Sequence, residues 1–159
     1  MCLIVKNGSA FVAQEDIQTY KVVLIDKRAL QTKEKTDWHG LYQFRKHFPF
    51  DVVLEETGSN EDDMHKSKLS YRTISIAGGF FHSTTDIEDA MKLEQSIKYY
   101  EYYEEFGERI YRGGYKSFGK LMLVSVICKA TIPKGSVCYK GAYDQHRMAS
   151  TKLIVHYPF

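Results

Sequence analysis

The sequence has few cysteines and no long apolar stretch, the features that usually indicate a disulfide framework or a membrane or secreted protein. Its three cysteines form no CxxC pair and are odd in number, so neither a disulfide scaffold nor a cysteine-rich zinc site is predicted. No stretch approaches the roughly 18 consecutive apolar residues of a membrane span, and the apolar start of the chain is interrupted at Lys6. We therefore expect a soluble, cytoplasmic protein with reduced thiols and no membrane association.

The familiar catalytic motifs are also absent. The chain has no Walker or GxGxxG glycine pattern, no HExxH and no GxSxG. Asp62, Asp63 and His65 are residue types that bind metals, but they lie in a polar segment without a further partner at a defined spacing. The sequence therefore predicts no metal, no cofactor and no catalytic residue.

What the sequence does contain is enough apolar material for one core, with 43% hydrophobic residues in 159. We expect residues 1–159 to form a single domain. β-branched and apolar runs predict strands at 18–25, 51–56, 71–77, 121–132, 136–141 and 151–157. Gly78 and Gly79 would mark the end of a strand or a bulge, and Pro133 with Gly135 predicts a type I turn.

One long helix is predicted to begin at Thr85. Thr85 and Glu88 have the spacing of a capping box, and the following apolar residues recur at helical spacing. The helix is expected to end near Gly107. The predicted fold class is therefore α+β: a twisted, largely antiparallel sheet with one long helix packed on it.

The segment GGFFHSTTDIEDA, residues 78–90, contains the first candidate binding residues. His82 follows a strand and precedes the helix start, where its neutral form is favoured and can hydrogen-bond a ligand or a buried carbonyl. Free amides at the helix start could receive an anion beside His82 and Ser83. The alternative is a core histidine satisfied by backbone groups.

A second candidate is the tyrosine-rich segment 99–119. Arg109, Arg112 and Lys116 alternate there with aromatic residues, so the segment could stack a base while its cations hold phosphate. Alternatively, its tyrosines cover a sheet surface with their hydroxyl groups in water. A nucleic-acid partner is not predicted from a single RGG.

Charge is distributed unevenly along the chain. Residues 85–108 hold eight acidic residues and two lysines, whereas residues 109–152 hold nine basic residues and one aspartate. Folding could bring the two segments together so that they neutralise each other, or could leave a basic face for an anionic partner.

Three short segments carry a resemblance. The order of TYKVV (19–23), GGFFHSTTDIEDA (78–90) and CKATIPKGSVCYKG (128–141) resembles small, largely uncharacterised domains found in bacteria and their phages. The same order is distantly similar to the ADP-ribosyltransferase fold. In that family, an aromatic-basic pair on the first strand, a hydroxyl motif after a phenylalanine and a late catalytic glutamate surround NAD.

The resemblance implies roles for four residues of this chain. Tyr20 and Lys21 would stand where the family holds its cofactor, and Ser83 with Thr84 would stand in its hydroxyl motif. The catalytic acid expected near residues 148–152 is absent, and hydroxyl groups cannot replace its negative charge. If the fold is shared, a nucleotide-sized cleft could persist without the catalyst.

Three functions follow as hypotheses. The first is a non-catalytic binding or accessory protein of bacterial or phage origin, which holds a nucleotide or another phosphorylated small molecule. The second is a protein-interaction or structural protein that uses segment 99–119 to bind a partner or to form a homodimer. The third is a divergent ADP-ribosyltransferase-like enzyme. The predicted ligand-binding residues are Tyr20, Lys21, His82, Ser83, Thr84, Arg109, Arg112 and Lys116.

Overall fold

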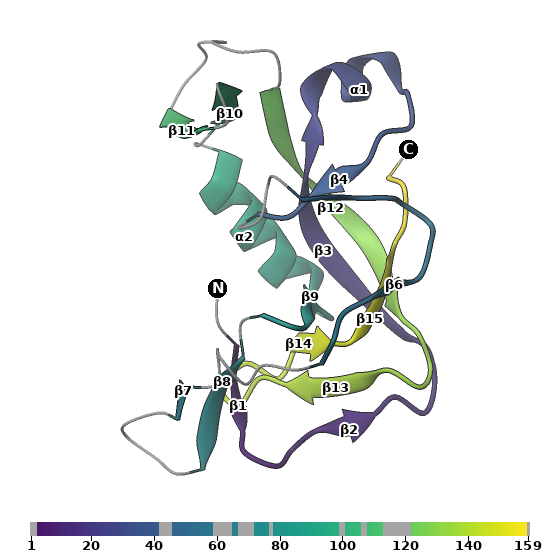
Figure 1. The fold of residues 1–159 in the computed structure, drawn as a ribbon, viewed down its shortest axis with the longest axis vertical. Coiled ribbons are helices and arrows are strands. Elements are labelled where there is room, and N and C mark those ends of the chain that lie inside the picture. The colour runs from purple at the N-terminus through teal and green to yellow at the C-terminus, as the bar shows by residue number, and fades with distance from the viewer. Residues whose placement is uncertain are drawn as a thin grey trace.

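The fold is built mainly from strands (Figure 1). The computed structural model describes residues 3–41, 46–58, 65–66, 72–76, 78–98, 101–105, 108–112 and 122–158. Within these ranges only two segments are helical, α1 (Lys27–Thr32) and α2 (Ile87–Lys98). The predicted α+β class with one long helix is therefore wrong, because residues in strands far outnumber residues in helices.

Two long antiparallel strands form the centre of the larger sheet. They are β3 (Ile17–Asp26) and β12 (Met122–Ile132), which pair without interruption from Ile17↔Ile132 to Asp26↔Leu123. Both segments are rich in β-branched residues, which suit a pleated and half-buried surface. These two strands confirm the predictions for 18–25 and 121–132.

Shorter strands extend this sheet on both sides. Beyond β12 lie β10 and β11, and beyond β3 the order continues through β9, β14, β13 and β2, while β4, β5, β15 and β6 attach off this path. Their bounds are β2 (Phe11–Val12), β4 (Trp38–His39), β5 (His47–Phe48), β6 (Leu54–Glu55), β9 (Phe81–Thr84), β10 (Glu101–Glu105), β11 (Glu108–Arg112), β13 (Val137–Lys140), β14 (Arg147–Ser150) and β15 (Lys152–Val155). Every pairing among the described strands is antiparallel.

A separate three-stranded sheet lies at the lower left of Figure 1. It contains β1 (Leu3–Lys6), β8 (Thr73–Ile76) and β7 (His65–Lys66), with β8 in the middle. Its alternating apolar residues pack with Phe80 and Ala149 into one buried cluster. This cluster joins the small sheet to β14 of the larger one.

The N-cap of helix α2 lies one residue later than predicted, and the helix ends much earlier. The Asp86 carboxylate accepts the amide of Glu88 at 3.0 Å and thereby caps the helix, a role predicted for Thr85. The helix ends at Lys98, and residues 101–105 and 108–112 pair as β10 and β11 instead of continuing it to Gly107. The tyrosine-rich sequence of this segment favours a strand, and pairing with β12 stabilises it there.

The turn after β12 also differs from its prediction. Ser136 donates its amide to the carbonyl of Pro133 at 3.1 Å, so the turn spans 133–136 and Gly135 occupies its third position. Gly135 has a φ of 88°, which a type II turn requires at this position and a type I turn does not. The strands predicted on either side of the turn are present as β12 and β13.

The sheet is covered differently on its two faces. Helix α2 packs Ala90 and Leu93 against Val22 and Leu24 of β3 and Leu123 of β12. The opposite face carries the larger core cluster, which includes the fully buried residues Trp38, Ile132, Leu153 and Val155. Within the described ranges, neither helix is long and apolar enough to cross a membrane.

Candidate functional site

The site begins at an interruption of the sheet. One edge of β3 is paired along its length with β12, but the other edge is shared by two strands. There, Tyr20 pairs with Thr84 of β9, and Leu24 pairs with His39 of β4. No other described strand occupies this edge between those two pairs, so the sheet is open beside residues 21–23.

A cavity of about 400 Å³ occupies this opening. Its lining includes Val22, which lies on the face toward α2, and Lys21, which points to the opposite face because side chains alternate along a strand. The remaining walls come mainly from the segments 38–41, 78–84, 89–93 and 147–148. The volume is in the range of about 300–1,000 Å³ that is typical of small-molecule sites.

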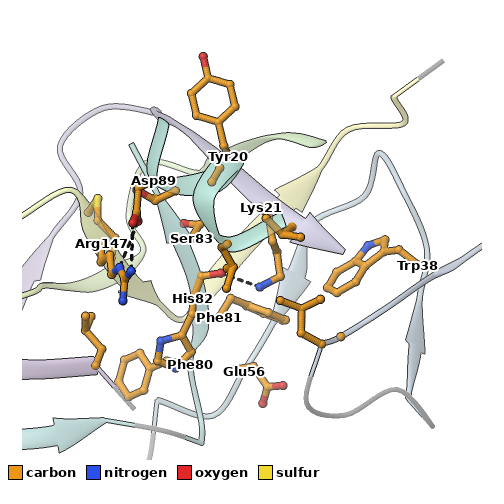
Figure 2. Close-up of a pocket in the computed structure, with 18 of the residues that line it drawn as sticks. Tyr20, Lys21, Trp38, Glu56, Phe80, Phe81, His82, Ser83, Asp89 and Arg147 are labelled. Atoms are coloured by element: carbon orange, nitrogen blue, oxygen red, sulfur yellow. Dashed lines mark hydrogen bonds and ion pairs between the residues drawn. The ribbon is translucent and has the colours of Figure 1, made fainter. Parts of the chain in front are cut away.

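Lys21 is the cationic group at the centre of this lining (Figure 2). Its Nζ donates a hydrogen bond of 2.6 Å to the backbone carbonyl of His82 and lies 5.8 Å from the centroid of the Trp38 ring. None of the described aspartates or glutamates forms an ion pair with it. Burial among apolar neighbours lowers the pKa of Lys21 to about 8, against a smaller opposing effect of Cys128.

Aromatic side chains form part of the cavity wall. Trp38 is 1% exposed and stacks on Phe48, with ring centroids 4.6 Å apart. Phe48 in turn meets the edge of Phe81 at 6.2 Å. Within the described residues, the Trp38 Nε1 and the buried Ser83 Oγ have no hydrogen-bond partner, which is costly for buried polar groups.

An ion pair closes the end of the cavity next to α2. Arg147 donates two hydrogen bonds to Asp89, from Nε to Oδ2 at 3.1 Å and from Nη2 to Oδ1 at 3.0 Å. The Arg147 guanidinium lowers the pKa of the Asp89 carboxyl below its usual value. This contact links the acidic segment 85–108 to the basic segment 109–152, so part of the charge asymmetry is neutralised internally.

Replacing Asp89 by asparagine should destabilise the protein by about 1–2 kcal/mol at pH 7, since two charge-assisted hydrogen bonds become neutral ones. Because the folded-state pKa of Asp89 is lowered, its contribution is complete above the ordinary value of 3.8 and is lost as the pH falls through the folded value. Urea unfolding of both proteins at pH 7 and pH 3 measures this. A constant difference at both pH values would contradict the assignment, and Glu88→Gln, on the exposed first turn, is the control.

The structure brings five of the eight predicted binding residues together. Tyr20, Lys21, His82, Ser83 and Thr84 all line the cavity. The Tyr20 ring projects away from Lys21 and Trp38 (Figure 2). Arg109 and Arg112 belong to β11, whose side chains lie outside the described part of the structure, and Lys116 lies outside the described residues altogether.

Fewer backbone amides are free to bind an anion at the start of α2 than the sequence suggested. The amide of Asp86 is bonded to Thr84 Oγ1 at 3.2 Å, and the amide of Glu88 is bonded to Asp86. Thr85 donates its amide to the carbonyl of His146. These three amides are therefore occupied, and the cation that an anion would meet is Lys21.

The hydroxyl groups of Ser150 and Thr151, near the position expected for the catalytic acid, form hydrogen bonds with the backbone. Ser150 Oγ donates to the carbonyl of Lys152 at 2.9 Å, and Thr151 Oγ1 accepts the amide of Val137 at 3.0 Å. Neither supplies the negative charge that the resemblance requires near residues 148–152.

Sequence reasoning missed most of the other lining residues, among them Trp38, Glu56, Asp89 and Arg147. Trp38 is the only tryptophan of the chain and lies in a short strand without a clear apolar pattern. Glu56, Asp89 and Arg147 are charged residues in segments far apart in sequence, and only tertiary pairing brings them together. A single tryptophan next to a histidine and a glycine, at 38–40, was the one local feature that could have drawn attention.

Cysteine and metal chemistry find no support in the described part of the chain. Burial raises the pKa of Cys128 to about 12 and that of Cys138 to about 11, so both thiols stay protonated near neutral pH. Within the described ranges, no group of three or more metal-binding side chains is present. Asp62 and Asp63 lie outside those ranges.

Comparison of the chain with protein-family models, with curated proteins and with solved structures gave no match. The resemblance to bacterial and phage domains and to the ADP-ribosyltransferase fold therefore stays a prediction.

Proposed function

We propose that this protein binds a small molecule that has a planar or apolar body and an anionic group. We propose further that this ligand is a nucleotide or another phosphorylated compound. The observation that carries the proposal is the Lys21 ammonium group, which lies on the wall of a mostly aromatic and apolar cavity without a carboxylate partner among the described residues.

Charge supports an anionic ligand. At neutral pH, Lys21 with a pKa of about 8 is mostly protonated, and its burial makes the charge costly until an anion neutralises it. Arg147 also lines the cavity, but Asp89 and Asp144 already hold its guanidinium, at 3.0 Å and 3.3 Å. Lys21 is therefore the better anchor for a phosphate or carboxylate.

Shape supports a planar body. The rings of Trp38, Phe48 and Phe81 line the same cavity as the amine, and flat apolar groups of this kind can pack against a base or another ring. The Tyr20↔Thr84 pair also brings the two segments named by the ADP-ribosyltransferase resemblance to one wall of the same cavity. Without the late acidic residue, binding without catalysis is the simpler function.

A thermal-shift comparison tests the proposal. AMP, cyclic AMP, NAD and phenyl phosphate are each added to the wild-type protein, and adenosine and phenol serve as matched compounds without the anion. We expect at least one phosphorylated compound to raise the Tm by several degrees at concentrations well above its Kd, and its neutral match to raise it less.

The contribution of the amine is tested with Lys21→Met, which keeps an unbranched side chain and removes the charge. This change should weaken binding of the stabilising phosphorylated compound by at least about tenfold, since a charge-assisted contact of roughly 1.5–3 kcal/mol is lost. Lys129→Met, at an exposed position of β12, should bind as the wild type does. Equal binding by both variants, or no stabilisation by any of the four compounds, would overturn the proposal.

A further inference from the structure

The Lys21 amine has surroundings that suit a nucleophile as well as a cation. Its nitrogen lies against the cavity, held by one hydrogen bond to the neutral carbonyl of His82. The Trp38 ring faces it at 5.8 Å, and no described carboxylate is paired with it. A lysine in this environment is easier to deprotonate than one in water. Burial costs the neutral amine little hydration free energy, whereas it costs the ammonium much.

From this geometry we propose that Lys21 is a covalent attachment site for a small carbonyl compound, an aldehyde or ketone with a planar apolar body, which it holds as an imine. The inference rests on the proposed ligand-binding function, because the same cavity must admit the compound. It goes further by assigning a bond-forming role to one atom, the Lys21 Nζ.

The reaction balances without any co-reactant. The lone pair of the neutral amine attacks the carbonyl carbon, the C=O π electrons move to oxygen, and a proton passes from nitrogen to oxygen to give a carbinolamine. Loss of the hydroxyl group with a second proton then forms C=N and one molecule of water. No group is oxidised or reduced, and hydrolysis reverses the step.

The surrounding side chains fit this product. An imine of an aromatic aldehyde is flat, and it would extend from Lys21 toward the rings of Trp38 and Phe81 (Figure 2). The lowered pKa of Lys21, about 8, leaves roughly one amine in ten neutral at pH 7, against roughly one in three thousand for a lysine of pKa 10.5. The position therefore offers both the neutral nucleophile and, in the cavity, space for the product.

Reductive trapping tests the inference. The full-length protein is incubated at pH 7 with benzaldehyde and sodium cyanoborohydride, and the benzylated lysines are located and quantified by peptide mass spectrometry. We expect the initial labelling rate at Lys21 to exceed that at the exposed Lys129 by at least about tenfold, as its larger neutral fraction requires. The same reaction in 8 M urea should remove this difference.

Two variants control the assignment. Lys21→Arg keeps a cation but cannot form an imine, and it should abolish the fast labelling phase, whereas Lys129→Arg should leave it intact. AMP added before benzaldehyde should slow labelling at Lys21, because both compounds need the same cavity. Labelling of wild-type protein that shows no preference for Lys21 would overturn the inference, and this measurement does not depend on whether a variant folds.

The outcome also separates the inference from the proposed function. If AMP raises the Tm but Lys21 is not labelled faster than Lys129, the cavity binds ligands without covalent attachment and the imine assignment is wrong. If no phosphorylated compound binds and Lys21 is not labelled, both proposals fail together. Fast labelling at Lys21 without binding of phosphorylated compounds would support imine formation and contradict the proposal that the cavity binds an anionic ligand.

Discussion

Replacing Trp38 by alanine should lower the free energy of unfolding by about 3–5 kcal/mol, the largest effect expected of any single change in the cavity wall. Trp38 is 1% exposed, belongs to the main core cluster and stacks on Phe48. Its removal would leave a large void next to the existing cavity. Strand β4 is short and is held by one residue pair with β3, Leu24↔His39, and by two with the two-residue strand β5. Denaturant unfolding measures the loss.

Two variants make the Trp38 result interpretable. Trp38→Phe retains a ring and removes the unpartnered Nε1, so its loss should be smaller, about 1–2 kcal/mol. Tyr143→Ala removes an aromatic residue that is 82% exposed and should change stability by less than about 0.5 kcal/mol. If Trp38→Ala were no more destabilising than Tyr143→Ala, the wall of the cavity would not be formed as described.

The second large effect is the pH dependence introduced by Lys21. Its folded-state pKa, about 8, lies below the value of 10.5 expected in the unfolded chain. Between these two values the unfolded state binds more protons, so stability rises with pH in that window. Relative to Lys21→Met, the wild type should therefore gain about 1–3 kcal/mol as the pH rises from 7 toward 10.5, an amount discounted because the side chain keeps some contact with solvent.

The slope with pH is the informative quantity, not the difference at one pH. Lys21→Met also leaves the His82 carbonyl without its 2.6 Å hydrogen bond from Lys21, a loss that shifts the difference equally at every pH. Urea unfolding at pH 7, 8, 9 and 10 separates the two contributions. A difference between wild type and Lys21→Met that does not change with pH would show that the amine is not desolvated, and Lys129→Met provides the exposed control.

Local sequence patterns predicted the two long strands of the sheet well. β3 and β12 are long, β-branched and fully paired, so pattern and tertiary context agree there. The pattern was wrong for residues 101–105, which were predicted as helix and form β10. A helical stripe and a tyrosine-rich strand share apolar positions over a few residues, and pairing of Tyr102 and Tyr103 with β12 decides for the strand. That pairing partner is about 20 residues away and leaves no trace in a local window.

The candidate site could be predicted only in part, because long-range strand pairing also decides which residues meet there. Lys21 was named because TYKVV resembles the first strand of the ADP-ribosyltransferase fold, and His82 and Ser83 because of their place before a helix. The opening in the sheet between Tyr20↔Thr84 and Leu24↔His39 depends on where β9 and β4 leave β3. The cavity, with Trp38 and Arg147 in its walls, is a consequence of that divergence and cannot be seen in any one segment.

The most direct test of the central claim, that the opening beside β3 is a ligand site anchored by Lys21, is an NMR titration of ¹⁵N-labelled protein with AMP. The amide shifts are expected to change first at residues 20–22, 38–41 and 78–84, which line the cavity, and to change much less in Lys21→Met at the same AMP concentration. Unchanged spectra, or shifts confined to residues outside these segments, would contradict it.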